Sequence, residues 1–272
     1  MTAPLLEVKD LVVRFGAGRR TSEVIHGVSF DLEAGSTLSL VGESGSGKTT
    51  IGRAILGLAP VSEGQIRFRG EVISNISRSR RRSVASDIQV VFQDPYSSLN
   101  PSMTVESILV EPLLAAGVPD ARLRVRELLE AVRMPAGAGG RYPREFSGGQ
   151  RQRIAIARAL ALKPAVIICD EPTSALDVTT QATVLALLKE IQQQTGVAYL
   201  FISHDLGVVN EMSDRIAVLR QGEIVELGDA TQVATAPAHP YTRRLQMAAP
   251  IADPKRQRER RAARLALLAA EG

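Results

Sequence analysis

The sequence has few of the residue types that mark disulfide-rich, metal-cluster and membrane-embedded proteins. Its 272 residues include one cysteine and no tryptophan, and aromatic residues make up 4%. The single cysteine, Cys169, excludes an internal disulfide and any cluster held by several thiolates. No run approaches the roughly 18 apolar residues needed to cross a bilayer, and the first ten residues lack the basic and apolar regions of a signal peptide. We therefore expect a soluble, cytosolic chain.

Positive charge is in modest excess, with a formal net charge of +4 and an isoelectric point near 9.5. Two clusters concentrate this charge, and we interpret both as solvated surface. Contact with anionic lipid headgroups is one alternative. Nucleic-acid binding is the other, although few aromatic residues are present on which bases could stack. The clusters are Arg78, Arg80, Arg81 and Arg82, and then Lys255, Arg256, Arg258, Arg260, Arg261 and Arg264.

Short β-branched runs alternate with amphipathic stretches, a pattern typical of a parallel sheet flanked by helices. This pattern predicts strands at 37–41, 88–92, 165–169 and 197–202. Near the end of the chain, 216–220 and 223–227 flank a Gln221–Gly222 turn, which predicts a hairpin. The fold class is therefore α/β.

Apolar spacing predicts the helices between these strands. The first carries Ile51, Ala54, Ile55 and Leu58 on one face, and we expect Pro60 to end it. A long helix is predicted to run to about residue 194, with Asp177 at its N-cap.

The segment 94–146 differs from the rest of the α/β pattern. It opens with a turn-rich stretch and continues as helices, with Val125, Leu128, Leu129 and Val132 on one stripe and Asp120 as the expected cap. We interpret it as a helical lobe inserted into the core. From residue 236 onward the chain is rich in proline and alanine and then basic, which indicates an appendage, with a basic, alanine-rich helix predicted at its end.

A glycine-rich segment, GESGSGKTT at 42–50, lies between the first buried strand and the first helix. It satisfies the Walker A phosphate-binding pattern in that context. Successive backbone N–H groups can turn toward one anion there, and the helix N-terminus adds its positive dipole end. We expect Lys48 to reach the β- and γ-phosphates of ATP and the Thr49 hydroxyl to bind Mg²⁺. The ATP-binding residues expected in this segment are Gly42, Glu43, Ser44, Gly45, Ser46, Gly47, Lys48, Thr49 and Thr50.

The run VIICDE at 166–171 predicts a buried strand that ends in two carboxylates. A parallel strand delivers such groups to the carboxyl edge of its sheet, where ligands bind. We expect Asp170 to hold Mg²⁺. Because side chains alternate along a strand, Glu171 should point differently and reach the attacking water. Cys169 is interpreted as a small buried hydrophobe, not a reactive thiol.

The segment FSGGQRQRIAIARAL at 146–160 places Ser147, Gly148 and Gly149 before a helix expected to begin near Gln150. This is a second helix N-terminus suited to an anion, and one ATP cannot readily occupy both within a single chain. With this segment, the sequence resembles the ABC ATPase family over nearly its whole length. The resemblance implies that Ser147, Gly148, Gly149 and Gln150 bind the γ-phosphate of ATP held by a second subunit, in a head-to-tail dimer.

The same resemblance assigns the remaining motifs. Gln93, in VVFQDP, matches the Q-loop glutamine, which contacts ATP, Mg²⁺ and the attacking water. Ser174 and Asp177 match the D-loop at the dimer interface. His204, in FISHDL, matches the catalytic switch histidine at the γ-phosphate, and Phe15 is the aromatic expected to stack on adenine. His26 and His239 have no such context, and we expect them to be structural.

The resemblance also implies an architecture. It is a RecA-like P-loop NTPase core with an N-terminal antiparallel β region and an inserted helical subdomain. We expect an ABC ATPase domain over 1–235, with the subdomain at about 94–146, and a C-terminal extension over 236–272. ATP and Mg²⁺ are the expected cofactors.

Two further segments, 90–113 and HPYTRRLQMAAP at 239–250, resemble the dipeptide/oligopeptide importer subfamily, which includes nickel and glutathione importers. The resemblance implies a peripheral subunit on the cytoplasmic face of a bacterial-type membrane. Its partners would be a second ABC ATPase subunit (identical or paralogous), two membrane permeases and, indirectly, a substrate-binding protein, with no nucleic acid. Some members carry a cysteine-rich iron–sulfur segment, which the single cysteine excludes here.

Two alternatives to an importer stay open at this point. One is a soluble ABC ATPase of DNA repair or translation, but such proteins usually carry two cassettes or a long coiled-coil insertion. The other is an accessory subunit of a phosphonate-cleaving complex.

Overall fold

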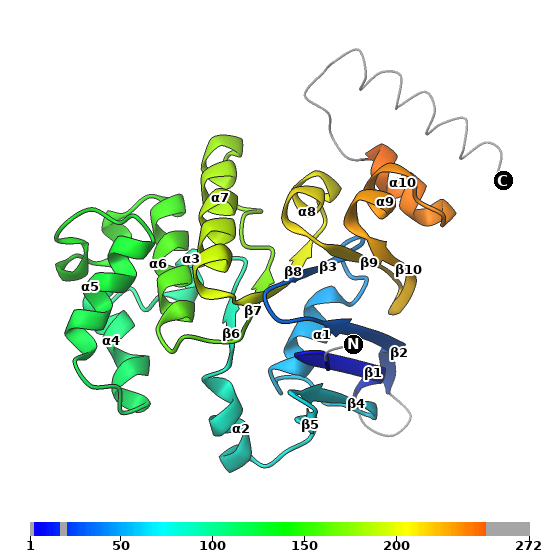
Figure 1. Cartoon of the computed structure of the whole chain (residues 1–272), viewed down its shortest axis with the longest axis horizontal. Helices are drawn as coiled ribbons and strands as arrows, with labels where there is room; N and C mark the ends of the chain where they lie inside the picture. The colour runs from blue at the N-terminus through cyan, green and yellow to red at the C-terminus, as the bar shows by residue number, and fades with distance from the viewer. Residues whose placement is uncertain (1–2, 17–20, 249–272) are drawn as a thin grey trace.

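The computed structural model describes residues 3–16 and 21–248, which form two sheets surrounded by helices (Figure 1). The four-stranded sheet has the order β2-β1-β4-β5, and every pairing in it is antiparallel. Its strands are β1 (Leu6–Phe15), β2 (Ser22–Leu32), β4 (Glu63–Phe68) and β5 (Glu71–Val72). The expected N-terminal antiparallel β region is therefore present.

The six-stranded sheet has the order β10-β9-β3-β8-β7-β6. All neighbours in it are parallel except β9 and β10. Its strands are β3 (Thr37–Val41), β6 (Ile88–Val91), β7 (Val166–Asp170), β8 (Ala198–Ser203), β9 (Arg215–Arg220) and β10 (Glu223–Asp229). The predicted strands are confirmed, and their ends differ from the predicted ones by at most two residues.

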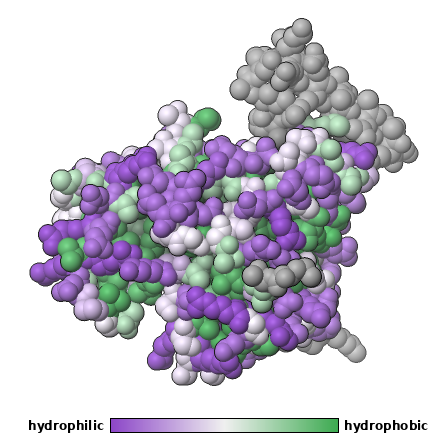
Figure 2. All heavy atoms as spheres, in the orientation of Figure 1, coloured by the Kyte–Doolittle hydropathy of each residue, from purple (hydrophilic) through white to green (hydrophobic). Residues whose placement is uncertain are grey.

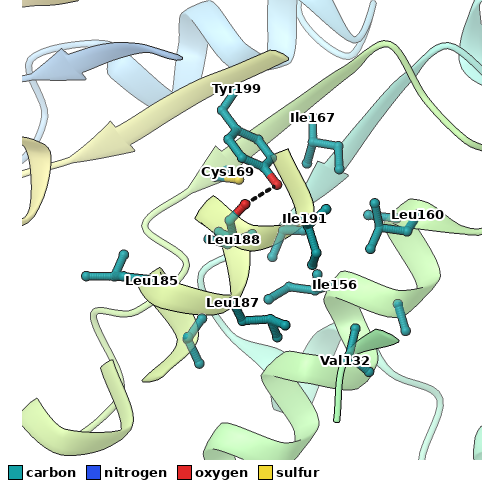
Figure 3. Close-up of a cluster of buried hydrophobic side chains, with 14 of the residues drawn as sticks. Val132, Ile156, Leu160, Ile167, Cys169, Leu185, Leu187, Leu188, Ile191 and Tyr199 are labelled. Carbon is teal, nitrogen blue, oxygen red and sulfur yellow. Dashed lines mark hydrogen bonds between the residues drawn. The ribbon is translucent and has the colours of Figure 1, made fainter. Parts of the chain in front are cut away.

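The central strands of this sheet are buried on both faces, which is why they read as continuous apolar runs. In β7, Val166 and Ile168 pack into one hydrophobic cluster, whereas Ile167 and Cys169 pack into another. Alternation of side chains along the strand sends the two pairs to opposite faces. Figure 3 shows the second cluster, where the hydroxyl of Tyr199 donates a hydrogen bond to the carbonyl of Leu188 at 3.0 Å. Cys169 is fully buried, as expected for a small hydrophobe.

The predicted terminal hairpin is formed by β9 and β10. Both turn residues have positive φ, 48° at Gln221 and 83° at Gly222, as a two-residue type I′ turn requires. Glycine is also required by space, because a Cβ at Gly222 would lie 2.3 Å from the carbonyl oxygen of Val24 in β2. The hairpin tip is therefore packed against the four-stranded sheet.

Helices cover both faces of the six-stranded sheet (Figure 1). The helices outside the segment between β6 and β7 are α1 (Lys48–Ile55), α2 (Arg78–Ala85), α7 (Val178–Thr195), α8 (Leu206–Met212), α9 (Ala230–Thr235) and α10 (Pro240–Ala248). Between β6 and β7 the chain forms α3 (Pro95–Ser98), α4 (Val105–Ala115), α5 (Ala121–Ala131) and α6 (Gly148–Leu160). Short 3-10 turns lie at Ala138–Gly140 and Pro143–Glu145.

The helices α3, α4, α5 and α6 gather at one end of the molecule, beside the edge strand β6 (Figure 1). The predicted stripe of Val125, Leu128, Leu129 and Val132 is buried there. Asp120 occupies the N-cap position of α5 as expected, but it has φ of 53° and its side chain makes no capping hydrogen bond. In this left-handed conformation the backbone enters the helix without side-chain help. Asp177, by contrast, does cap α7.

The expected end of α1 is wrong. The helix stops at Ile55, Leu58 is 66% exposed, and Pro60 lies well beyond the end. Gly57 adopts φ of 73°, which turns the chain out of the helix. The guanidinium of Arg81 then donates to the carbonyl of Ile55 at 3.0 Å, which satisfies one of the carbonyls left unpaired at the helix end.

The first basic cluster forms α2, a helix without buried residues. Arg78, Arg80 and Arg82 are exposed, and Arg80 pairs with Glu71 at 3.0 Å. Arg81 departs from the solvated-surface interpretation, because burial lowers its pKa and its guanidinium contacts backbone carbonyls. The second basic cluster and the predicted terminal helix lie outside the described residues.

The view in Figure 2 shows a mainly hydrophilic surface with scattered apolar residues. Within residues 3–16 and 21–248, no helix has both the length and the apolar character needed to cross a bilayer.

Candidate functional site

Four sequence motifs meet at the carboxyl edge of the six-stranded sheet. β3 leads into the glycine-rich loop at 42–50, β8 ends before His204, β7 ends in Asp170, and β6 ends two residues before Gln93. These strands are neighbours in the order β3-β8-β7-β6, and all run parallel. Their ends therefore converge at one place, as the rule for ligand sites in parallel sheets predicts.

The glycine-rich loop is shaped by close backbone contacts. A Cβ at Gly42 would lie 2.1 Å from the carbonyl oxygen of Leu219, and one at Gly47 would lie 2.5 Å from a methyl of Ile25. Gly47 also has φ of 107°, which side chains disfavour. The loop therefore turns tightly over β9 and β2 and then enters α1 at Lys48.

Lys48 is a buried cation that spans this loop. Its Nζ donates to the carbonyl oxygens of Gly42 at 2.8 Å and Glu43 at 2.9 Å. Burial lowers the pKa of Lys48, while the carboxylates of Glu171, Asp170 and Glu43 act in the opposite direction. A polyanion placed here would restore the charge balance that burial disturbs.

Thr49 and Asp170 form the second part of the site. The Thr49 hydroxyl donates to Asp170 Oδ1 at 3.0 Å. Burial raises the pKa of Asp170, Glu171 adds to this rise, and the hydrogen bond from Thr49 opposes it. Both groups offer hard oxygen ligands, which suit Mg²⁺. In the described part of the chain, no cluster of three His, Cys, Asp or Glu residues could hold a metal alone. A magnesium ion would thus need ligands from phosphates and water, which is its usual mode of binding.

Glu171 lies at the centre of a polar triad. Its Oε2 accepts a hydrogen bond from Gln93 Nε2 at 3.1 Å, and its Oε1 lies 3.2 Å from His204 Nδ1. The backbone of Glu171 has φ of 48°, an uncommon conformation for this residue type. Hydrogen bonds from its N–H to Ile202 and from the Ser174 hydroxyl to its carbonyl hold it there.

Glu171 points away from Asp170 as expected, but the reason expected from side-chain alternation is wrong. The strand ends at Asp170, so alternation along β7 does not extend to the second carboxylate. The left-handed turn instead directs Glu171 toward Gln93 and His204. Strained backbone of this kind is often held in place at functional sites.

A pocket runs along the glycine-rich loop and reaches Gln93 and Glu171. Its lining residues are Val24, Ser44, Gly45, Gly47, Lys48, Thr49, Thr50, Gln93 and Glu171. Phe15 is not among them and stands 42% exposed at the end of β1. Val24 was missed by the sequence motifs, because it reaches the loop only through the packing of β2 on Gly47, where an added Cβ would lie 3.4 Å from the carbonyl oxygen of Val24.

The signature residues form a separate helix start. Ser147 and Gln150 make a reciprocal capping box, with the Ser147 hydroxyl accepting from the Gln150 N–H at 3.3 Å and Gln150 Oε1 accepting from the Ser147 N–H at 3.0 Å. The helix begins at Gly148, two residues earlier than expected. Among the described residues that line the loop pocket, none comes from 147–150.

The D-loop residues connect the two regions. The carboxylate of Asp177 accepts from the backbone N–H of Thr180 at 2.9 Å and from its hydroxyl at 2.7 Å, and these hydrogen bonds lower the pKa of Asp177. Thr180 in turn packs against Gly149, where an added Cβ would lie 2.2 Å from its methyl group. Ser174 contacts the backbone of Glu171, so this segment touches both Glu171 and the signature helix.

Two histidines have structural contacts, in agreement with their expected roles. His26 Nδ1 lies 2.9 Å from Glu23, and His239 Nδ1 accepts from the N–H of Tyr241 at 3.1 Å. Tyr241 is a further contact that motif reasoning missed. Its hydroxyl oxygen accepts from the N–H of Glu43, within the glycine-rich loop, at 3.2 Å.

Two family models match the chain. The first, described as ABC transporter, matches residues 25–174, which is more than half of the chain. The second, described as Oligopeptide/dipeptide transporter, C-terminal region, matches residues 225–270.

Curated relatives include the glutathione import ATP-binding protein GsiA of Salmonella paratyphi A and that of Escherichia coli. Each is 50% identical over 268 residues, covering 95% of this chain and 43% of the relative. The chain therefore spans less than half the length of these relatives.

Solved structures with the same fold include cbiO1 from Clostridium perfringens, part of the ABC transporter complex cbiONQ. It has a TM-score of 0.77 and 26% identity, covering 85% of this chain and 91% of that one. Another is the ATP-binding cassette MJ0796, as a dimer in a post-hydrolysis state bound to ADP and Pi. Its TM-score is 0.74 with 28% identity, covering 83% of this chain and 98% of that one. The fold, the motifs and the matched models agree, and the chain belongs to the ABC transporter family.

Proposed function

We propose that this chain binds and hydrolyses ATP to energise an ABC importer for di- or oligopeptides or a related small solute. The observation that carries the proposal is the convergence of Lys48, the Thr49–Asp170 pair and the Gln93–Glu171–His204 triad at one sheet edge. The oligopeptide/dipeptide model and the glutathione importers among the relatives support the transport class.

The glycine-rich loop holds the triphosphate in this proposal. The loop 42–50 presents its backbone N–H groups and the N-terminus of α1 to the phosphates, apart from the N–H of Glu43, which is bonded to Tyr241. Lys48 exchanges its contacts with the carbonyls of Gly42 and Glu43 for the β- and γ-phosphates. Phe15, exposed at the end of β1, is the residue we propose to stack on adenine, beside Val24 in the pocket wall.

Thr49, Asp170 and Gln93 are the residues that would hold Mg²⁺. When bound, this ion offsets negative charge on the phosphates. The Thr49 hydroxyl and the Asp170 carboxylate already lie together, so their oxygens need little rearrangement.

Glu171 acts as the general base in this mechanism. It accepts a proton from the water that attacks the γ-phosphorus, and the bond from that phosphorus to the β-γ bridging oxygen breaks to give ADP and phosphate. Gln93 and His204, both in contact with the carboxylate, orient it and the water, and His204 stabilises charge on the transferring group.

A second ATPase subunit, identical or paralogous, completes each site. We propose that its Ser147, Gly148, Gly149 and Gln150 close on the γ-phosphate, with Ser174 and Asp177 at the interface. The separate location of the signature helix N-terminus supports this arrangement, since those residues do not line the chain's own described pocket. The dimeric form of MJ0796 supports it as well.

The proposed division of the chain is an ABC ATPase domain over 1–235, with a helical subdomain at about 94–146, and an importer-type extension over 236–272. We place the subunit peripherally on the cytoplasmic face of a bacterial membrane, bound to two permeases and indirectly to a substrate-binding protein. A role in DNA repair or translation, or in a phosphonate-cleaving complex, is not favoured, because both matching models describe transporters.

Lys48→Ala tests the proposed nucleotide site. It removes the cation beside the phosphates, so ATP binding should weaken by tenfold or more and turnover should be lost. Lys189→Ala, on the exposed face of α7, is the matched control and should leave both unchanged. Calorimetry with Mg-ATP and phosphate release measure the two effects. Wild-type turnover in Lys48→Ala would refute the site.

The transport role needs a separate test. Purification of the tagged chain from membranes of its source should recover two permeases in stoichiometric amounts. Reconstituted with its binding protein, the complex should take up peptide only with ATP. A chain recovered only from the soluble fraction, with full ATPase activity, would count against the importer.

A further inference from the structure

The segment that follows the six-stranded sheet returns to the glycine-rich loop. After β10, the helices α9 and α10 pack beside β9 and β10 (Figure 1). Tyr241, in the first turn of α10, is only 4% exposed. Its hydroxyl oxygen accepts a hydrogen bond from the backbone N–H of Glu43 at 3.2 Å, across 198 residues of sequence.

α10 is held in place by β10 through its N-terminus. The carboxylate of Glu226 accepts from the backbone N–H groups of Ala238 at 2.7 Å and His239 at 3.1 Å. Burial acts to raise the pKa of Glu226, but these backbone N–H groups help to hold it below its usual range. His239 then accepts from the N–H of Tyr241. The hydroxyl of Tyr241 is thus placed by a chain of contacts that begins on the sheet.

Both the backbone N–H and the backbone carbonyl of Glu43 form hydrogen bonds. Its N–H donates to Tyr241, and its carbonyl accepts from Lys48 Nζ at 2.9 Å. The guanidinium of Arg220 lies over the Tyr241 ring, 5.3 Å from its centroid, which further restrains the ring. The loop residue next to Gly42 is therefore fixed by α10 and by the lysine that faces the pocket.

We propose that Tyr241 is a positioning residue for nucleotide binding, whose hydroxyl holds the Glu43 peptide so that the glycine-rich loop stays open for phosphate. The segment after β10 thereby sets the affinity of the loop. This inference rests on the proposed function, because it assigns an added contact to the same site. Glu43 itself need not contact phosphate, since its N–H is already bonded to the tyrosine.

Loss of the Tyr241 hydroxyl should weaken nucleotide binding. In Tyr241→Phe the Glu43 N–H loses its acceptor, and the loop relaxes to satisfy it elsewhere. Nucleotide binding must then restore the open loop, which weakens affinity by roughly three- to tenfold, as expected for one hydrogen bond. Glu171 and His204 are untouched, so kcat changes by less than about twofold while KM rises.

The matched control is Tyr199→Phe. This variant also loses a single hydrogen bond, the one from the Tyr199 hydroxyl to the Leu188 carbonyl. Tyr199 lies in the hydrophobic cluster shown in Figure 3, away from the glycine-rich loop. Both variants should lose similar thermal stability, but only Tyr241→Phe should weaken nucleotide binding. Glu226→Ala, which frees the N-terminus of α10 and leaves the tyrosine intact, should weaken binding in the same direction.

The experiment measures Kd for Mg-ADP by calorimetry, KM and kcat for ATP, and amide exchange of the peptide covering 42–50, all on the full chain. Faster exchange in Tyr241→Phe with a raised Kd supports the proposal. Unchanged Kd and exchange, or equal losses of affinity in Tyr241→Phe and Tyr199→Phe, would overturn it. If wild type itself binds no nucleotide, the proposed function fails; if wild type binds and Lys48→Ala does not, a normal Tyr241→Phe refutes only this inference.

Discussion

Asp170 and Glu171 are adjacent carboxylates that occupy different surroundings. Asp170 ends a buried strand and bonds to Thr49, and burial raises its pKa. Glu171 turns away through a left-handed backbone and contacts Gln93 and His204. Asp170 is suited to bind a cation, because a positive charge would offset the cost of burying its carboxylate. Glu171 is suited to receive a proton from water, because it faces the pocket.

The raised pKa of Asp170 gives a stability prediction. A carboxyl whose folded pKa exceeds its unfolded value destabilises the fold as pH rises above 3.8 and through the folded pKa. Asp170→Asn removes this cost while it keeps an acceptor for Thr49. The nucleotide-free variant should therefore melt at a higher temperature than wild type at pH 8.

The advantage of Asp170→Asn should shrink at pH 5, and added Mg-ATP should stabilise the variant less than wild type. Differential scanning calorimetry at both pH values measures this. Asp31→Asn, which breaks a surface pair with Arg215, is the control and should not raise Tm. A lower Tm for Asp170→Asn at pH 8 would contradict the expected burial cost.

At the scale of elements, α6 and α7 meet at a close contact between Gly149 and Thr180. The Thr180 hydroxyl is bonded to Asp177, the N-cap of α7, so the side chain cannot rotate away without loss of that bond. The start of the signature helix is therefore packed directly on the segment that follows the D-loop. This contact provides a path by which changes at one subunit's Asp177 reach its Gly149.

Gly149→Ala should break this contact. An ideal Cβ would lie 2.2 Å from the Thr180 methyl, so the helices must separate or Thr180 must turn. Overpacking of this kind costs about 1–3 kcal/mol, which lowers Tm by roughly 2–12 °C. Gly140→Ala, where a Cβ meets nothing within 4 Å, is the matched control. Equal melting temperatures for Gly149→Ala and wild type would show that α6 and α7 adapt freely.

We propose that the segment after Gln93 contacts a permease, because it leads from the site directly into the helical lobe. Tyr96, 60% exposed on α3, stacks on Arg151 of α6 with the guanidinium 4.0 Å from the ring centroid. Changes over 96–100 should reduce uptake by a reconstituted complex, whereas changes at Gln93 should also slow hydrolysis. Tyr142→Ala removes another exposed tyrosine stacked by an arginine and serves as control for Tyr96→Ala. Intact uptake after changes at 96–100 would exclude this stretch as the contact.

For the whole molecule, Glu171→Gln should trap the closed dimer. The change keeps size and hydrogen bonding but removes the proton acceptor, and the loop and signature helix stay intact. Hydrolysis should slow by roughly a hundredfold or more, so the dimer should accumulate with Mg-ATP. Size-exclusion chromatography with ATP, compared with ADP, reports the shift.

The Glu171→Gln experiment must include a paralogous subunit if the chain associates only with one, since the other site then continues to hydrolyse. A variant that hydrolyses at the wild-type rate would remove Glu171 from catalysis. A Glu171→Gln variant that binds ATP but never dimerises, even with a paralogue, would argue against ATP sites formed between two subunits.

Local sequence determined much of this protein. Apolar runs where strands are buried and the Asp177 cap follow from short-range chemistry, so the fold class and the motif-bearing strands could be predicted. Local patterns failed at Leu58, where they placed the end of α1 too late, and at Asp120 they placed the start of α5 but not the way it is capped. There a left-handed glycine, a distant arginine and a left-handed entry to the helix set the ends.

Tertiary structure alone decided which groups meet at the site. Motifs from β3, β6, β7 and β8 come together because parallel strands end at one edge, and no spacing in the sequence encodes their order. The backbone of Glu171 is left-handed because Ile202 and Ser174 hold it. Tyr241 reaches Glu43 because β10 anchors α10 beside the loop. Such contacts depend on how distant segments pack. That packing is set by interactions over the whole fold, so no single stretch of sequence determines it.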